Sequence, residues 1–171
     1  IKEGVALITE DRKVTGLNLS GSVNDNIAMV AIKKLLSHGL YNKNKARAAS
    51  MEYIKKLNIK TPSGDQITGN LSGGNQQKIV IAKWLLNDPV IIILDEPTRG
   101  IDVGAKRDIY LLLGKLVQQG KAVIMISSEI PELMGVCDRI MVMCEGNLSG
   151  EVQRDAFSQE RIMTLASAIE V

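Results

Sequence analysis

Aromatic residues and cysteines are scarce in this chain. Its 171 residues include one Trp, one Phe and three Tyr, too few to form the base-stacking platforms of a single-stranded nucleic-acid binder. The two cysteines, Cys137 and Cys144, have neither the spacing of a metal site nor the number of a disulfide framework. We therefore interpret them as small buried hydrophobic side chains in a reducing compartment.

Long apolar runs, a targeting segment and a strong charge are also missing. No run approaches the roughly 18 apolar residues of a membrane-spanning helix, and there is no signal peptide. The net charge of +2 is too small to indicate a nucleic-acid or membrane surface. The chain opens on Ile1 and runs directly into a predicted strand, so we interpret it as a piece of a longer protein.

The order of the remaining patterns predicts an α/β fold. Short β-branched apolar runs at 4–9, 90–94, 122–126 and 139–144 have the pattern of buried strands, with both faces of the strand at 90–94 covered. Helical patterns at 105–118 and 131–136 separate the last three. This alternation predicts a parallel core with right-handed crossovers. A turn at 145–147, an edge strand at 148–152 and an amphipathic helix at 157–168 follow.

The block between the first two strands is helical. Ser22 is a suitable cap for a helix over 22–36 that ends at His38-Gly39, and a second helix is expected over 42–57. The lysines and arginines of this second helix have the spacing of a solvated face. Turn residues at 61–65 close the block.

The stretch from Leu71 to Lys78, Leu-Ser-Gly-Gly-Asn-Gln-Gln-Lys, leads from this block into an apolar helix. Ser72 is expected to cap that helix by accepting from its first backbone N–H groups. Gly73 and Gly74 allow close approach of an anion to the positive end of the helix dipole. The stretch therefore indicates a phosphate site. The alternative is an ordinary Ser-capped helix with a flexible start.

Acidic residues follow two of the predicted strands. Asp95 and Glu96 come directly after four buried aliphatic residues, where lone carboxylates carry a desolvation cost. They suit a magnesium-bound phosphate: Asp95 would hold the ion, and Glu96, on the opposite side of the pleat, would polarise an attacking water. The charged run 10–13 after the first strand lies where ligands bind in open α/β sheets. Its alternative is a solvated loop.

Together these motifs resemble the nucleotide-binding domain of ATP-binding cassette (ABC) proteins. Leu71–Lys78 resembles the family's signature motif, 91–96 its Walker B strand and 100–102 its D-loop. The residues of these motifs are similar to those in the second half of bacterial import ATPases for ribose, galactose, xylose and similar monosaccharides. The same holds for Ile8–Lys13 and for Ile-Ser-Ser-Glu-Ile-Pro-Glu-Leu at 126–133. These ATPases carry two cassettes in one chain.

The resemblance implies a P-loop NTPase-like α/β core that lacks its own P-loop, with an inserted helical subdomain. No Gly-x-x-x-x-Gly-Lys-[Ser/Thr] occurs in the sequence; in the family it lies upstream of the position where this chain begins. The implied division is 1–19 for the first core strand and Q-loop, 20–86 for the helical subdomain with the signature helix, 87–150 for the catalytic core and 151–171 for the tail.

The resemblance also implies roles for individual residues. Glu96 is the catalytic carboxylate and Asp95 the metal ligand. Two positions depart from the family pattern: Glu10 stands in place of the Q-loop glutamine, and Ser128 in place of the switch histidine. The implied ATP contacts are Leu71, Ser72, Gly73, Gly74, Asn75, Gln76 and Asp102.

The implied function is an ATPase with ATP and Mg²⁺ that powers monosaccharide import from the cytoplasmic face of the bacterial membrane. Its partners would be a second cassette, membrane permease subunits and, indirectly, a periplasmic sugar-binding protein, with no nucleic acid. The signature loop would close on ATP held by the other cassette's P-loop, so Gly74→Asp is expected to impair turnover more than Glu96→Gln. Alternatives are a non-transport ABC ATPase and a catalytically degenerate regulatory half.

Overall fold

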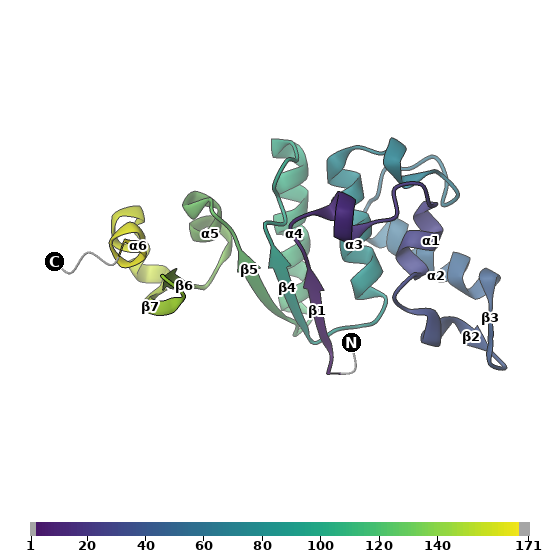
Figure 1. Ribbon diagram of the computed structural model, residues 1–171, viewed down its shortest axis with the longest axis horizontal. Coiled ribbons are helices and arrows are strands. Elements are labelled where there is room, and N and C mark those ends of the chain that lie inside the picture. The colour runs from purple at the N-terminus through teal and green to yellow at the C-terminus, as the bar shows by residue number, and fades with distance from the viewer. Residues whose placement is uncertain (1–2, 168–171) are drawn as a thin grey trace. The chain divides into compact units, whose positions relative to one another are not determined.

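The computed structural model describes residues 3–167, and the chain divides into two compact units (Figure 1). The first unit is Ile1–Ile126 and the second is Ser127–Val171. The first contains a parallel sheet and most of the helices, and the second contains an antiparallel hairpin with two helices. The four-part division predicted from the sequence has different borders and stays a prediction.

A three-stranded parallel sheet forms the centre of the first unit. Its strands are β1 (Val5–Ile8), β4 (Ile91–Asp95) and β5 (Ala122–Ile126), in the order β1-β4-β5. Ile8 is paired with Leu94, and Leu94 with Met125, so all three strands end at the same edge. The strands predicted at 4–9, 90–94 and 122–126 are confirmed, and so is their parallel arrangement.

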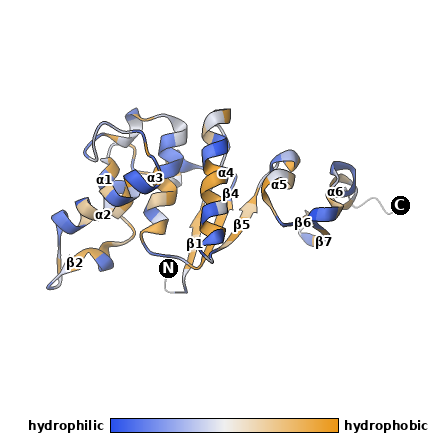
Figure 2. Cartoon of the chain, turned by 180° about the vertical axis from the view of Figure 1, so that it is seen from behind, coloured by the Kyte–Doolittle hydropathy of each residue, from blue (hydrophilic) through white to orange (hydrophobic). Residues whose placement is uncertain are grey.

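Helices cover one face of this sheet. α3 (Gly73–Leu85) and α4 (Val103–Gln118) share one hydrophobic core with Ile8, Ile92 and Leu94, each at most 1% exposed. α4 lies behind the strands in Figure 1 and in front of them in Figure 2, which also shows the apolar character of the strands. Strand residues that alternate with these point to the other face, because successive side chains of a strand point in opposite directions.

That other face is apolar and open to solvent. Leu7, Ile124 and Ile126 are 48%, 51% and 49% exposed. The prediction that the strand at 90–94 is covered on both faces is therefore wrong for the described chain, because the helices of the first unit lie on one side only. The continuous apolar run is real, but its alternate residues Ile91 and Ile93 are half-buried.

The segment between β1 and α3 is mostly helical. In chain order it contains the π-helix η1 (Arg12–Gly16), α1 (Val23–Ala28), the 3₁₀ turn η2 (Ile32–Leu35), the short strands β2 (Leu36–Ser37) and β3 (Leu40–Tyr41), α2 (Lys43–Lys56) and the 3₁₀ turn η3 (Thr68–Asn70). The helix predicted over 42–57 is confirmed as α2, with Asn42 as its cap.

The helix predicted over 22–36 is wrong beyond Ala28. Ala31 N donates to Ala28 O at 3.0 Å, which tightens the chain into a shorter turn. The Val30 carbonyl accepts from Asn87 Nδ2 at 3.1 Å, and Lys34 Nζ donates to Leu86 O. Asn87, which follows α3, thus takes a backbone carbonyl that a longer helix would use, and periodicity in the sequence does not reveal this contact.

The chain enters and leaves this helical segment at one narrow connection, which we call the neck (residues 18–23 and 66–69). Backbone hydrogen bonds join its two segments. Val23 N donates to Gln66 O at 3.0 Å, Thr68 N to Gly21 O at 3.0 Å and Gly69 N to Leu19 O at 2.9 Å. The buried side chain of Asn26 adds to them, since its Oδ1 accepts from Asn18 N at 2.8 Å and its Nδ2 donates to Thr68 Oγ1 at 3.0 Å.

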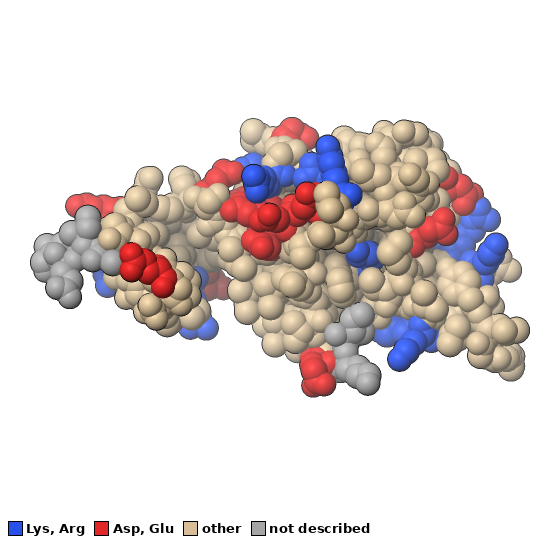
Figure 3. Space-filling model, viewed as in Figure 1, with Lys and Arg blue, Asp and Glu red and all other residues tan. Residues whose placement is uncertain are grey.

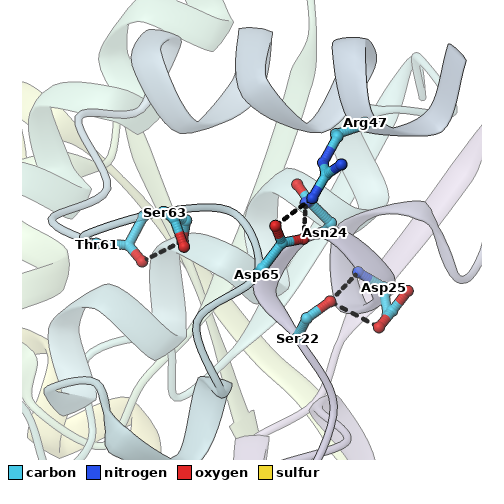
Figure 4. Close-up of polar contacts among 7 residues, drawn as sticks. All are labelled: Ser22, Asn24, Asp25, Arg47, Thr61, Ser63 and Asp65. Carbon is cyan, nitrogen blue, oxygen red and sulfur yellow. Dashed lines mark hydrogen bonds and ion pairs between the residues drawn. The ribbon is translucent and has the colours of Figure 1, made fainter. Parts of the chain in front are cut away.

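Polar contacts beside the neck hold α1 and α2 to the loop before α3 (Figure 4). Arg47 of α2 forms an ion pair with Asp65, and Asn24 Nδ2 of α1 donates to Asp65 Oδ1 at 3.2 Å. Ser22 Oγ accepts from Asp25 N at 3.1 Å, so the predicted cap of α1 is confirmed.

In the second unit, β6 (Arg139–Cys144) and β7 (Asn147–Gln153) form an antiparallel hairpin. The prediction of β6 as a third parallel strand after β5 is wrong, because its hydrogen-bonded partner is β7. Glu145 and Gly146 both have positive φ (48° and 82°), the conformation that a two-residue hairpin turn requires.

Helices complete the core of the second unit. α5 (Ile130–Val136), the 3₁₀ turn η4 (Arg154–Ala156) and α6 (Gln159–Ala166) accompany the hairpin. Ile140, Val142, Val152 and Ile162 form its buried cluster. Cys137 and Cys144 are free and half-buried rather than fully buried, and burial raises the pKa of the Cys137 thiol. The helix predicted over 157–168 corresponds to α6, and residue 168 lies outside the described residues.

Candidate functional site

The loops that follow β1 and β4 lie at the carboxyl edge of the sheet, together with the first turn of α3. The loop after β1 contains η1, the loop after β4 is the turn 96–102, and the first turn of α3 belongs to the signature stretch. Acidic and basic side chains gather on this side of the first unit (Figure 3). Ligands of open α/β sheets bind at the carboxyl edge, so these segments form the candidate site.

Asp95 and Glu96 differ in backbone conformation. Asp95 is the last residue of β4, lies in register with Ile126 and is half-buried. Glu96 has left the strand, with φ of +46°, and its N–H donates to Ile126 O at 2.9 Å. The expectation that Glu96 lies on the opposite side of the pleat is therefore wrong. Its direction is set by a left-handed backbone conformation, which is uncommon for a residue with a side chain.

Asp95 suits a shared magnesium site better than a site formed by protein alone. Within residues 3–167 no cluster of three or more His, Cys, Asp or Glu side chains could hold a metal. Mg²⁺ is commonly held by one or two carboxylates together with substrate phosphates and waters. A single half-exposed carboxylate at the end of a strand fits that second arrangement, in which the nucleotide supplies the remaining oxygen ligands.

Ser72 occupies the N-cap position of α3, but its side chain does not cap the helix. Its exposed hydroxyl instead accepts from Asn75 Nδ2 at 2.9 Å. Asn75 Oδ1 in turn accepts from Lys60 N at 2.8 Å. The predicted cap bond is thus wrong, because Asn75 takes the hydroxyl and ties it to the loop after α2. The backbone N–H groups at the start of α3 keep the partial positive charge of a helix N-terminus.

The two signature glycines are required by packing within the chain itself. A Cβ at Gly74 would lie 2.5 Å from the Ala105 Cβ of α4, and one at Gly73 would lie 2.8 Å from Arg12 Nη2. Neither glycine has a positive φ. The sequence suggested that these glycines allow approach from outside, whereas the structure shows that they first allow α3 to approach α4 and η1. Gly74→Asp would therefore disrupt packing as well as any ligand contact.

Gln76 and Leu71 shape the loop before α3. Gln76 is 5% exposed, and its Nε2 donates to Leu71 O at 3.0 Å and to Thr68 O at 3.3 Å. Leu71 packs against the main core. These contacts give both residues a structural role, and their predicted contact with nucleotide stays a prediction.

Asp102 is also engaged structurally. Its Oδ1 accepts from Ala105 N at 2.9 Å and so caps α4. The cap satisfies a backbone donor at the helix start, which typically contributes about 1 kcal/mol. The predicted nucleotide contact of Asp102 stays a prediction.

The two predicted replacement residues lie apart in the chain. Glu10 is exposed in the loop between β1 and η1. Ser128 is exposed at the start of the second unit, next to Ser127, whose hydroxyl donates to Glu132 Oε2 at 2.5 Å. The structure brings Glu10 to the carboxyl edge of the sheet, and Ser128 belongs to the other unit.

Sequence reasoning missed two basic residues of this region, Arg12 and Lys83. Arg12 donates to the carbonyls of Arg99 and Gly100, which belong to the turn after β4. Lys83 of α3 is 5% exposed, and its Nζ donates to Gly16 O at 2.5 Å. Burial lowers the pKa of the Lys83 ammonium. The available signal was a lysine within the apolar run 79–86.

A second buried lysine links α3 to α4. Lys78 Nζ donates to Asp108 Oδ2 at 2.7 Å and to Asn58 O at 3.2 Å. This hydrogen bond, with the charge of Lys78, lowers the pKa of the Asp108 carboxyl. The signature helix is therefore fixed by side chains along its length as well as at its start.

Comparison with known proteins identifies relatives of this arrangement. The profile of the ABC transporter family matches residues 2–99. The chain is 54% identical over 169 residues to the ribose import ATP-binding protein RbsA of Clostridium tetani, covering 98% of this chain and 34% of that protein. It is 48% identical over 167 residues to RbsA of Lactococcus lactis subsp. lactis, with the same coverage of 98% and 34%. It thus spans about a third of the length of these curated relatives.

Solved structures share the fold. One is an ATP-binding cassette in a dimeric post-hydrolysis state bound to ADP and phosphate, with a TM-score of 0.74, 25% identity, and coverage of 90% of this chain and 64% of that chain. Another is an inward-facing ABC transporter of the metal-chelate type, with a TM-score of 0.79, 19% identity, and coverage of 96% and 64%. No helix within residues 3–167 is long and apolar enough to cross a membrane.

Proposed function

Because this chain belongs to the ABC transporter family, we propose that it is part of an ATPase that powers monosaccharide import, and that it supplies the signature loop of a composite ATP site. The observation that carries the proposal is the placement of Ser72. Its side chain is exposed at the positive end of α3, while the rest of the signature stretch is fixed by packing to η1 and α4. Such a helix start is suited to bind a phosphate that approaches from outside.

The second cassette would hold the nucleotide that this loop contacts. The nucleotide phosphates at this loop would be cradled by the P-loop of the partner cassette. The dimeric state and the bound ADP and phosphate of the similar cassette structure support this interpretation. We also propose that the chain corresponds to the second cassette of a two-cassette protein.

The carboxylates of β4 would act at the opposite ATP site. Asp95 would hold Mg²⁺, and the metal would neutralise charge on the phosphates. Glu96 would accept a proton from the water that attacks the γ-phosphorus, as a general base. With glutamate at position 10 and serine at position 128, this second site would turn over ATP more slowly than the site completed by Ser72.

The remaining partners follow from the import function. The names of the relatives, ribose import ATP-binding proteins, support a monosaccharide as the transported substrate. The helical segment would face permease subunits, which receive sugar from a periplasmic binding protein. The chain would therefore work as a peripheral component at the cytoplasmic face of the membrane.

The experiment is an ATPase assay of the complete transporter with Ser72→Asp. The new carboxylate would lie beside the γ-phosphate and repel it, so we expect turnover to fall by about 100-fold or more, the range seen when a transition-state contact is lost. Ser72 is exposed, so the substitution leaves the core packing of α3 intact. Gln118→Glu, at an exposed residue at the end of α4, adds the same charge outside the site and is expected to leave turnover unchanged.

Glu96→Gln in the same assay tests the assignment of roles. We expect it to lower turnover by about tenfold or less, because the site completed by Ser72 would still work. Equal losses from Ser72→Asp and Glu96→Gln would contradict the assignment. Full activity of Ser72→Asp would contradict the proposed function itself.

A further inference from the structure

Three segments that are far apart in the sequence meet at the guanidinium group of Arg12. The residue lies in the first turn of η1. Its Nη1 donates to Arg99 O at 2.8 Å and its Nη2 donates to Gly100 O at 3.1 Å. Arginine is suited to such paired bonds, because its donors form a rigid planar fork. The loop after β1 is thereby joined to the turn after β4.

The same group contacts the signature stretch. A Cβ at Gly73 would lie 2.8 Å from Arg12 Nη2 and 3.4 Å from Gly100 O. Glycine at position 73 therefore leaves the space that the fork occupies. A change in the position of the guanidinium group would alter both the turn after β4 and the first residue of α3.

The hydrogen-bond acceptors of the Arg12 guanidinium are neutral backbone carbonyls. No carboxylate in residues 3–167 forms an ion pair with Arg12, and its Nε is buried without a hydrogen-bond partner. A buried donor without a partner carries a cost in stability. This donor lies at the point where the three candidate functional segments meet.

The opposite end of η1 is also fixed. Gly16 O accepts from Lys83 Nζ, and a Cβ at Gly16 would lie 3.3 Å from Val80 Cγ2. The π-helix is thus fixed to α3 at its end and to the turn after β4 at its start. A shift of η1 would move both of the segments that Arg12 contacts.

We propose that Arg12 is a positioning residue, which holds the loop after β1, the signature glycine Gly73 and the turn after β4 in one fixed arrangement required for ATP turnover. This inference rests on the proposed function, since it assigns turnover to these segments. Its role differs from that of Ser72, because Arg12 acts through the backbone of its neighbours.

The first test measures ATP turnover in the complete transporter with Arg12→Met and Arg12→Lys. Lysine keeps the charge but lacks the planar fork. We expect kcat to fall about tenfold or more for Arg12→Met and by a smaller factor for Arg12→Lys, with KM for ATP changed less than twofold, because a small misplacement of reacting groups is costly in rate. Lys13→Met removes the same charge from the neighbouring exposed residue and is the matched control.

The second test is a double-mutant cycle between Arg12 and Gly73. Gly73→Ala places a methyl group where the fork lies, so it is expected to lower kcat by displacing Arg12. Once Arg12→Met has removed the fork, Gly73→Ala should lower kcat little further, and the two losses should not add. A role in folding alone would change the melting temperature of each variant without this coupling in kcat.

The outcomes separate the two proposals. Values of kcat for Arg12→Met and Arg12→Lys within twofold of Lys13→Met, or additive losses in the cycle, would overturn the role of Arg12. If Ser72→Asp still abolished turnover in that case, the proposed function would stand. If Arg12→Met failed to fold, Arg12→Lys and its own cycle with Gly73→Ala would decide the matter.

Discussion

The start of α3 and the end of β4 lie at the same edge of the sheet, but they differ in packing. At the start of α3, Gly73 and Gly74 are packed against Arg12 and Ala105, and Gln76 is hydrogen-bonded to the preceding loop. At the end of β4, Asp95 and Glu96 are half-buried. Contacts within the chain therefore shape the signature loop, whereas the Asp95 carboxylate at the end of β4 is half-exposed.

The largest expected effect is on the packing of α3 against α4. Gly74→Ala would bring two methyl carbons to 2.5 Å, and such overpacking typically costs about 1–3 kcal/mol in free energy of unfolding. Denaturant unfolding should show this loss and a substantial recovery in the double variant with Ala105→Gly.

Gly114→Ala is the matched control for this experiment. A Cβ at Gly114 of α4 would meet nothing within 4 Å, so the variant should be as stable as the original protein or slightly more stable, since alanine favours helix. Equal stability of Gly74→Ala and Gly114→Ala would show that the start of α3 is less constrained than the distances indicate.

A comparable effect is expected at Lys83. Lys83→Met leaves the Gly16 carbonyl without its donor, a loss of about 1–3 kcal/mol for a buried group. Burial lowers the pKa of Lys83 below its ordinary value of 10.5, so the unfolded chain binds more protons between these two values. Stability from this group therefore rises with pH in that window.

Unfolding measured from neutral pH to about pH 10.5 checks the sign of this effect. The stability difference between the original protein and Lys83→Met should widen as the pH rises through the lowered pKa of the folded state. Lys13→Met, at an exposed position, should show no such widening. A difference that narrows with pH would contradict a pKa lowered by burial.

The smallest expected effect is at Asp95. Asp95→Asn keeps the shape of a half-buried side chain, and its free energy of unfolding should stay within about 0.5 kcal/mol of the original value. Asp102→Ala, which removes the cap of α4, should cost about 1 kcal/mol by comparison. A larger loss at Asp95 than at Asp102 would reverse the contrast between the two regions.

The sequence predicts well those features that local pattern determines. The three apolar strands, α2, α4 and the cap at Ser22 depend on periodicity and on residues close in the chain, and all of them are confirmed. The glycine-rich loop before α3 is visible in the sequence, but the packing of its glycines is not. Their neighbours, Arg12 and Ala105, are distant in sequence, and one sequence does not show which distant residues meet.

The errors have the same physical origin. The helix from Val23 ends early where the chain tightens into a shorter turn at Ala31 and Asn87 takes the Val30 carbonyl. Residues 139–144 have the pattern of a buried parallel strand, but the two-residue turn after them provides a nearer partner, and the hairpin forms instead. The charged run at 10–13 fitted either a ligand loop or a solvated loop. Neither interpretation identifies the acceptors of Arg12, because these are backbone carbonyls, which every residue carries.

The neck has a consequence for how the helical segment can change in length. Its two segments are joined by backbone hydrogen bonds and by the side chain of Asn26. The residues between the two segments therefore form a closed loop whose ends are already together. The entropy of closing such a loop grows only slowly with its length. We therefore expect residues inserted at the exposed turn around Gly39 to leave the start of α3 in place, provided that residues 18–23 and 66–69 keep their pairing.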